Sequence, residues 1–551
     1  MLWAQSTMTL IGQSQECIEV HFDKSFYVAG ETVWFKAYLS AESGDVRSKI
    51  LHIDLVDHLN QNIATLKLPI NEKSSFASIP LPMDAYEGHY RFRAYTHYNM
   101  NFEPALVYET LLPVYQLSKD HQLPADSINS IPKQRLENSG ISLAFDKSVY
   151  QTRDTMRVSI QLLNSNDTQG ALDAPGRGNL SVAVIPLELA GLEVKTNPNT
   201  PCTRGKLKNE QPVPPQRTLY LEGKLRDPIT KTDAEPKLIT VFMDKSSRLI
   251  KAYADKGNIR IPVYDYWGTG VFQIMNLDPY NTTEFEFIAN SEVKFSTPYY
   301  NTELPVRTPV ILEYMDQLEK RRKIIELFEL NDLGEIKYSQ PPEMTADAVY
   351  HTEDYRDIYS FEEFINEAIG NVKVGAINGI KTIRLFNREL GDPFPQHPWY
   401  IVDGFTTYNE KEVLDIQYKD VVEVRLYSKT STVQEYFKDF TWNSGVVEII
   451  TRDVKYRRNL RNHPNVVQME GFTTTQNFSS TLKLPQNRTT PDLRGVLYWA
   501  PNVLTNDQGN GQLIIPLSDD SGEFAVVVKG RNGWGQFITG FSTFEIKTKL
   551  D

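Results

Sequence analysis

The sequence contains few of the residues that metal sites, disulfide frameworks and membrane spans require. Only two of its 551 residues are cysteine, Cys17 and Cys202, and they lie far apart along the chain. Two isolated cysteines provide neither a disulfide framework nor metal-ligand spacing, so the simplest expectation is two unpaired residues. The printed sequence has no run of about 18 apolar residues, which excludes a membrane-spanning helix.

Basic residues are also fewer than acidic ones. Lys and Arg number 58 against 70 Asp and Glu, and the formal net charge is -12. A general nucleic-acid-binding protein needs a basic face that displaces counterions from phosphates. We therefore expect no nucleic-acid partner.

Motifs for catalysis and cofactor binding are missing as well. The sequence has no G-x-S-x-G, no G-x-x-x-x-G-K-[ST] and no H-E-x-x-H pattern. The closest histidine pairs, His52/His58 and His89/His97, have even spacings typical of one face of a strand. The segment 519–522 could offer oxygen ligands to calcium, but a polar turn is the simpler interpretation. We predict no catalytic residue, no metal and no cofactor.

A long internal repeat stands out against these absences. The segment IEVHFDKSFYVAGETVWFKAYL begins at Ile18, and ISLAFDKSVYQTRDTMRVSIQL begins at Ile141, 123 residues later. In each copy apolar residues alternate with polar ones, an Asp-Lys-Ser turn follows, and a second alternating run comes next. Alternation with a period of two indicates half-buried strands.

The length of the repeat favours tandem β-sandwiches of about 100 residues each. We predict a mainly β chain of tandem Ig/fibronectin-like β-sandwiches with one α+β domain. The expected parts are a first sandwich at 15–117, a second at 138–216 that is interrupted by an insertion, a sandwich at 218–298, a helical linker at 301–350, an α+β domain at 355–455 and a C-terminal sandwich at 465–551. A capping box, Ser360 with Glu363, predicts a helix start inside the α+β domain.

Several stretches resemble known families. FDKSFYVAGETVWFKAYL (22–39) with EGHYRFRAY (87–95) resembles the macroglobulin-type sandwiches of bacterial envelope proteins. The stretch from LEGKLRDP to GNIRIPVYDYWGTGVFQI is similar to a carboxypeptidase-regulatory-like sandwich, and the C-terminal residues resemble a later macroglobulin sandwich. PWYIVDGFTTYN (398–409), with the strands at 414–428 and 443–452, resembles the plug domain of TonB-dependent receptors.

The chain departs from both families. A receptor barrel needs on the order of 20 strands of about 10 residues, and only about 100 residues follow the plug-like block, so we expect no barrel. The macroglobulin thioester requires Cys and Gln in a Gly-Cys-Gly-Glu-Gln context, which neither Cys17 nor Cys202 has. We therefore expect neither a transporter nor a covalent protease trap.

Two groups of residues are candidates for a functional site. Trp34, Tyr38, Arg91 and Tyr95 are predicted on outer strand faces, where exposed aromatics beside arginines suit a protein or glycan contact. Packing between domains explains them equally well. The plug-like motif is the second group, comprising Val402, Asp403 and Gly404; Asp-Gly after an apolar strand also fits a hairpin turn.

The preferred interpretation is a non-catalytic interaction or scaffold protein of the Gram-negative cell envelope, associated with an outer-membrane transport or assembly complex. Its partner would be an outer-membrane or other envelope protein. One alternative is a glycan- or peptide-binding surface protein for nutrient uptake, and another is a hydrolase with an inter-domain site. The first residues, MLWAQSTM, look like the end of a secretory signal peptide that is only partly present. We thus expect export to the periplasm or outer membrane.

Overall fold

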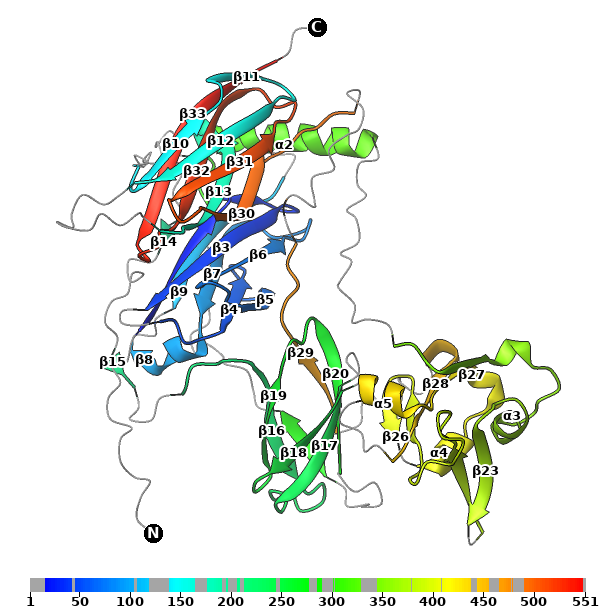
Figure 1. Ribbon diagram of the computed structural model, residues 1–551. Helices are drawn as coiled ribbons and strands as arrows, with labels where there is room; N and C mark the ends of the chain where they lie inside the picture. The colour runs from blue at the N-terminus through cyan, green and yellow to red at the C-terminus, as the bar shows by residue number, and fades with distance from the viewer. Residues whose placement is uncertain are drawn as a thin grey trace. The chain divides into compact units, whose positions relative to one another are not determined.

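A computed structural model shows a mainly β chain (Figure 1). It describes residues 15–41, 45–103, 107–117, 138–163, 176–190, 195–196, 206–208, 213–243, 248–276, 285–289, 301, 303–328, 344–377, 379–407, 409–437, 443–454, 465–476, 478 and 490–548. The chain forms two compact units. The first unit comprises Met1–Thr218, Phe295–Ile336 and Phe472–Asp551, and the second comprises Leu219–Lys294 and Lys337–Gly471.

The first sandwich of the first unit packs two sheets around one core. One sheet has the order β1-β3-β6, and the other has the order β14-β9-β7-β4-β5, with β2 paired to β9. The strands are β1 (Glu16–Phe22), β2 (Tyr27–Val28), β3 (Thr32–Ala41), β4 (Ile50–Val56), β5 (Asn62–Pro69), β6 (Ser74–Pro80), β7 (Gly88–Tyr95), β9 (Tyr108–Tyr115) and β14 (Lys195–Thr196). The alternating residues Val33, Phe35, Ala37 and Leu39 of β3 are fully buried in this core, as the period of two predicts.

The second sandwich is closed by the C-terminal strands. β10 (Ile141–Phe145) pairs with β12 (Thr155–Leu162), and β31 (Asn510–Pro516) completes that sheet. The opposite sheet has the order β11-β33-β32-β13-β30. Its strands are β11 (Val149–Gln151), β13 (Asn179–Pro186), β30 (Tyr498–Leu504), β32 (Gly522–Arg531) and β33 (Phe537–Lys547).

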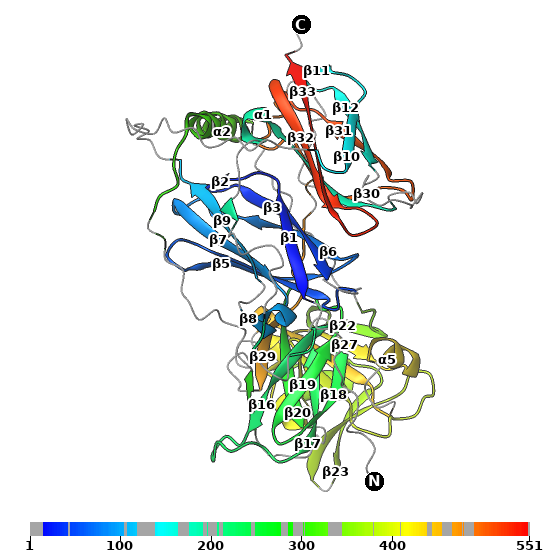
Figure 2. The same cartoon turned by 90° about the vertical axis from the view of Figure 1, so that its left-hand side faces the viewer.

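This topology corrects two predicted domains. The ranges 138–216 and 465–551 do not form separate sandwiches, because β12 pairs with β31 and β13 pairs with both β30 and β32. The second repeat supplies too few strands to cover both sides of a core, and the C-terminal strands supply the rest (Figure 2). The second unit is therefore inserted within the second sandwich.

The predicted helical linker is a packed element of the first unit. Helix α2 (Pro309–Leu327) begins after Thr308, whose side chain accepts a hydrogen bond from the Ile311 amide. Ile311, Tyr314, Met315 and Leu318 are buried in a cluster with residues from both sandwiches. The helix thus holds the two sandwiches together instead of serving as a linker, and residues 329–343 of the predicted linker lie outside the described residues. Short elements of the first unit are η1 (His97–Asn101), β8 (Phe102–Glu103), α1 (Leu187–Ala190) and β15 (Lys206–Leu207).

The second unit contains a small sandwich of two sheets, with the orders β19-β16-β21 and β18-β17-β20-β29. The strands are β16 (Leu219–Arg226), β17 (Lys237–Met243), β18 (Arg248–Ala254), β19 (Asn258–Val263), β20 (Thr269–Asn276), β21 (Glu286–Ala289) and β29 (Val466–Glu470). β29 was expected in the C-terminal sandwich, but it pairs antiparallel with β20.

The α+β part of the second unit has a five-stranded sheet with the order β22-β27-β28-β25-β26. Its strands are β22 (Ala348–His351), β25 (Trp399–Val402), β26 (Phe405–Thr407), β27 (Val421–Tyr427) and β28 (Val446–Thr451), and β23 (Val372–Ile377) forms a separate hairpin with β24 (Ile380–Leu385). The helical elements are η2 (Thr352–Asp354), α3 (Phe361–Glu367), α4 (Glu410–Leu414), η3 (Tyr418–Asp420), α5 (Thr430–Tyr436) and η4 (Arg452–Val454). Ser360 caps α3 by accepting from the Glu363 amide.

Cys17 is disulfide-bonded, so the expectation of an unpaired thiol at this position is wrong. Cys202 lies outside the described residues. In the described part of the chain, none of the helices has both the length and the apolar character that a membrane crossing requires.

Candidate functional site

The repeated sequence motif folds into a network of polar side chains. In the first copy, the Tyr27 hydroxyl donates to Asp23 Oδ1 at 2.6 Å, and the Trp34 amide donates to the same oxygen at 3.1 Å. Lys24 Nζ lies 2.5 Å from Glu31 Oε1, and Glu31 Oε2 accepts from a backbone amide. The motif therefore braces the turn between β1 and β3.

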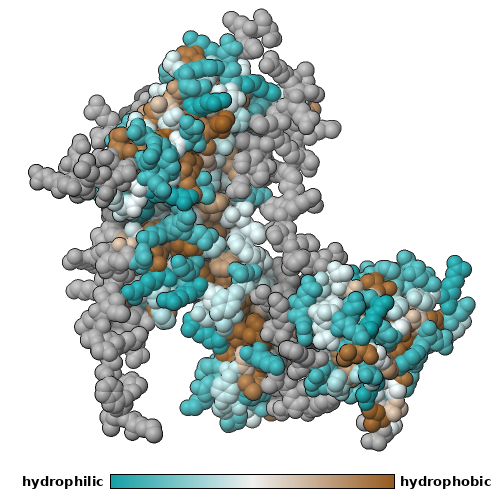
Figure 3. Space-filling model, in the orientation of Figure 1, coloured by the Kyte–Doolittle hydropathy of each residue, from teal (hydrophilic) through white to brown (hydrophobic). Residues whose placement is uncertain are grey.

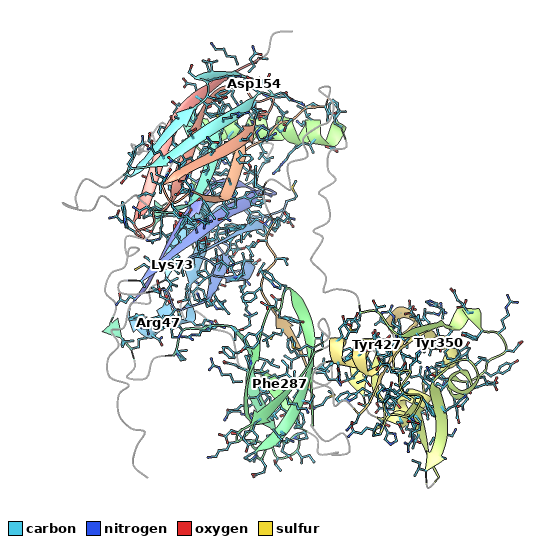
Figure 4. All side chains as sticks on the ribbon, in the orientation of Figure 1. Arg47, Lys73, Asp154, Phe287, Tyr350 and Tyr427 are labelled. Atoms are coloured by element: carbon cyan, nitrogen blue, oxygen red, sulfur yellow. The ribbon has the colours of Figure 1, made fainter. Side chains whose placement is uncertain are left out.

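The second copy repeats this network residue for residue, 123 positions later. The Tyr150 hydroxyl donates to Asp146 Oδ1 at 2.7 Å, and the Arg157 amide donates to it at 2.9 Å. Lys147 Nζ lies 3.1 Å from Asp154 Oδ2, near the surface of the second sandwich (Figure 4). The Asp-Lys-Ser repeat is thus first of all a folding motif.

Helix α2 covers only the first copy. The Tyr314 hydroxyl donates to Glu31 Oε1 at 2.5 Å and accepts from Lys24 Nζ at 2.7 Å. Burial raises the pKa of Asp23 to about 7. The exposed counterpart behaves in the opposite way, because the hydrogen bond from Tyr150 lowers the pKa of Asp146. The pKa of the motif's aspartate is therefore raised in the first copy, where it is buried, and lowered in the second, where it is exposed.

A second polar cluster lies between the outer face of β1 and β3 and the facing strand β13. His21 Nδ1 lies 2.6 Å from Ser181 Oγ, and the Tyr38 hydroxyl donates to Ser181 Oγ at 2.8 Å. Lys36 Nζ donates to Asn179 Oδ1 and to a backbone carbonyl. Burial lowers the pKa of Lys36 to about 7, and burial with two neighbouring cations lowers the pKa of His21 well below its usual value.

The Ser181–His21 contact resembles part of a nucleophilic pair, but it is enclosed. Ser181 is 0% exposed and His21 is 2% exposed. A nucleophile must reach a substrate carbonyl, and the two sandwiches cover this hydroxyl from both sides. In this arrangement the pair is a structural contact.

Three of the four residues predicted on an exposed surface are buried. Trp34 and Tyr38 are 7% and 1% exposed, and they pack between the two sandwiches against Phe478 and Phe537. Tyr95 is 4% exposed. For Trp34 and Tyr38, packing between domains is the correct alternative. One face of β3 packs in the core of the first sandwich, and the other packs against the second sandwich.

Arg91 and Tyr95 lie on the face of β7 opposite the core residues Tyr90, Phe92 and Ala94, and both contact neighbouring side chains there. Arg91 Nε lies 3.5 Å from Glu109 Oε1. The ring of Tyr95 stacks on His52 with centroids 5.4 Å apart, and His52 stacks on His97 at 4.2 Å. The structure therefore joins His52 with His97, a pair that even spacing along single strands did not predict.

The plug-like motif forms a two-residue hairpin. Val402 ends β25 and pairs with the first residue of β26, while Asp403 and Gly404 have φ angles of 50° and 84°. Positive φ at both positions is typical of a type I′ turn. The Asp403 carboxylate accepts from the amide and the hydroxyl of Thr451, at 2.8 and 2.5 Å. Asp403 thus ties this turn to the end of β28.

The described residues contain no group of three His, Cys, Asp or Glu side chains that could hold a metal ion. The calcium alternative at 519–522 fails for a direct reason. Asp519 is paired with Arg153, with 2.6 Å between its Oδ1 and Nε, and Asp520 is paired with Arg321, with 2.8 Å between Oδ1 and Nη2. Arginine takes the carboxylate oxygens that a cation would need.

Several residues of the buried cluster were missed by sequence reasoning, chiefly His21, Lys36 and Ser181. A signal was available in the repeat itself. The second copy has Ala144 and Ser159 where the first has His21 and Lys36. Small neutral residues in one copy and titratable residues in the other indicate that this strand face has different surroundings in the two sandwiches.

Among solved structures, bacterial alpha-2-macroglobulins are similar to this chain. No family model and no curated protein matches the chain. A crystal structure of Salmonella alpha-2-macroglobulin reacted with methylamine is similar at 11% identity and a TM-score of 0.26, covering 97% of this chain and 40% of that one. The native conformation of E. coli alpha-2-macroglobulin gives 10% identity and the same TM-score, covering 98% and 40%. The chain spans about two fifths of the length of these proteins.

Proposed function

We propose that this protein is a non-catalytic interaction or scaffold protein of the cell envelope, associated with an outer-membrane transport or assembly complex. The observation that supports it best is where the reactive side chains lie. Ser181, His21, Lys36 and Asp23 are all engaged in contacts that brace the first unit, and each is at most 2% exposed. A chain that uses such groups to fix the arrangement of its sandwiches is suited to presenting surfaces to partners.

Export is supported by the disulfide at Cys17, because disulfides persist in oxidising compartments such as the periplasm. The sequence contains one other cysteine, Cys202. The strands on either side of it, β14 and β15, pair with β9 and β8 of the first sandwich. We expect Cys202 to be the partner.

Peptide mapping under non-reducing conditions tests this pairing. The expected result is one cross-linked species that joins the peptide of Cys17 to that of Cys202 and disappears on reduction. Alkylation of both thiols in protein taken directly from cells would contradict the pairing and the export that it supports.

The α+β part of the second unit is the proposed contact with an envelope partner. Two large apolar side chains are strongly exposed there, Tyr359 at 84% and Leu390 at 72%. Aromatic side chains such as that of Tyr359 are enriched in protein interfaces. The first sandwich offers a matched control, Met83, which is 67% exposed.

Affinity purification of the tagged chain from gently solubilised envelopes tests the proposal. We expect a barrel protein in a fixed ratio. Substituting Tyr359→Asp together with Leu390→Asp should remove that partner, and Met83→Asp should retain it. A chain that emerges alone would overturn the proposal, and glycan or peptide binding would then be tested at the exposed Tyr253 and Tyr264 of the small sandwich.

A further inference from the structure

The interface between the two sandwiches of the first unit contains a cluster of basic groups around His21. His21 packs edge-on against Trp499, with ring centroids 5.1 Å apart, and it faces Ser181 of β13. The cations that act on it are Lys36 of β3 and Lys529 of β32. Three titratable basic groups therefore lie in or beside this contact, with Lys529 partly buried.

Two acidic groups lie near this contact. Glu19, two residues before His21 on β1, pairs with Arg531 of β32 at 2.8 Å. Glu72 acts on Lys36 through its charge. In the part of the chain that the structure describes, the hydrogen bonds of Lys36 go to neutral acceptors and the ring of His21 bonds to a hydroxyl. A proton added to His21 would thus create a third cation beside Lys36 and Lys529.

The internal repeat shows that the sandwich does not need these residues in order to fold. At the equivalent positions the second copy has Ala144 and Ser159, and its equivalent strand β12 leaves this face exposed. The visible surface of that sandwich is largely hydrophilic (upper part of Figure 3). Burying a basic group costs free energy. In the first copy this cost arises at the contact, because the second sandwich buries His21 and Lys36 there.

We propose that protonation of His21 opens the contact between the two sandwiches, so that the interface is released in acid. This inference does not depend on the proposed envelope partner. It requires only the buried cluster and the neutral form of His21 within it.

The direction follows from the pKa values on each side of the contact. Inside the interface the pKa of His21 is well below 6.5, its ordinary value, and it returns toward 6.5 when the sandwiches part. Opening is therefore coupled to uptake of a proton below pH 6.5, and the slope of its equilibrium constant approaches tenfold per pH unit well below that value. Lys36, with a pKa lowered to about 7, takes up its proton above that range.

Two acidic groups act in the opposite sense. The pKa of Asp23 is raised to about 7, but its carboxylate bonds to Tyr27 and to the Trp34 amide, both in the first sandwich. It therefore reports on loss of the α2 cover or on unfolding of that sandwich, and not on the contact of His21 with β13. Burial also raises the pKa of Glu19, which opposes opening in acid, so the His21→Gln variant, which keeps Glu19, is the reference for the test between pH 6.5 and 5.

Thiol labelling of the full chain measures the opening. Ala183 is 1% exposed on the β13 face toward the first sandwich, so Ala183→Cys reacts with 4,4′-dithiodipyridine only when the interface opens. We expect its rate, corrected for the thiolate fraction, to rise about 15-fold in total from pH 6.5 to 5. Adding His21→Gln should abolish this rise. Ala77→Cys, buried inside the first sandwich, is the control for unfolding and should not follow it.

Labelling of Ala183→Cys that is independent of pH, or that rises equally with His21→Gln, would overturn the proposal. A rise at Ala77→Cys equal to that at Ala183→Cys would also overturn it, because the sandwich would then be unfolding. Lys529→Met supplies an independent variant if His21→Gln does not fold. Removing that cation should make labelling at pH 5 at least severalfold slower, and an unchanged rate would contradict the mechanism.

Discussion

Replacing Arg494 with methionine is expected to lower the free energy of unfolding of the first unit by about 3–5 kcal/mol. The guanidinium donates to both carboxylate oxygens of Asp492, at 2.8 and 2.5 Å, and to the carbonyls of Leu497 and Pro516. Both side chains of the ion pair are under 10% exposed. Methionine would leave the Asp492 carboxylate buried without its cation.

Two variants make this prediction specific. Lys320→Met removes an ion pair whose side chains are 68% and 60% exposed on α2, so it should change the free energy of unfolding by at most about 1 kcal/mol. Adding Asp492→Leu to Arg494→Met should recover most of the loss, because an apolar pair needs no charge compensation. Denaturant unfolding of the three variants measures all these values. A loss below about 1 kcal/mol for Arg494→Met would show that Asp492 finds another partner.

The sequence predicted local structure well wherever a pattern lay within one segment. Alternation placed β3 and β12 correctly, Ser360 and Glu363 marked the start of α3, and Asp403-Gly404 indicated a turn. Each of these signals depends on neighbours along the chain, for which backbone geometry sets the spacing. The mainly β fold followed from their sum.

The pairing of distant segments could not be predicted in the same way. An alternating strand has a buried face and an exposed face, but the alternation does not identify the neighbour that covers it. β31 was therefore assigned to a separate domain, although it pairs with β12. Trp34 and Tyr38 were placed on an exposed surface for the same reason, since the strand that covers them, β13, lies over 140 residues away.

The repeat also offers a matched pair for electrostatics, because Asp23 and Asp146 make the same hydrogen bonds in different surroundings. The pKa of Asp23 is raised from 3.8 to about 7 by burial, so the folded state holds a proton that the unfolded chain releases. The stability that this proton contributes is fully present below pH 3.8 and is lost as the pH rises through 7. Between pH 5 and 8 the wild-type chain should lose about 3 kcal/mol through this group.

Asp23→Asn removes that titration, so the difference in unfolding free energy between this variant and the wild type should shift by about 3 kcal/mol in favour of the variant from pH 5 to pH 8. Asp146→Asn should show no such shift, since the pKa of Asp146 is lowered and its contribution is lost only as the pH falls below 3.8. Denaturant unfolding at both pH values measures the two differences. Equal shifts for both variants would mean that helix α2 does not set the electrostatics of the first copy, whereas a shift confined to Asp23→Asn would assign the effect to the burial of the first copy.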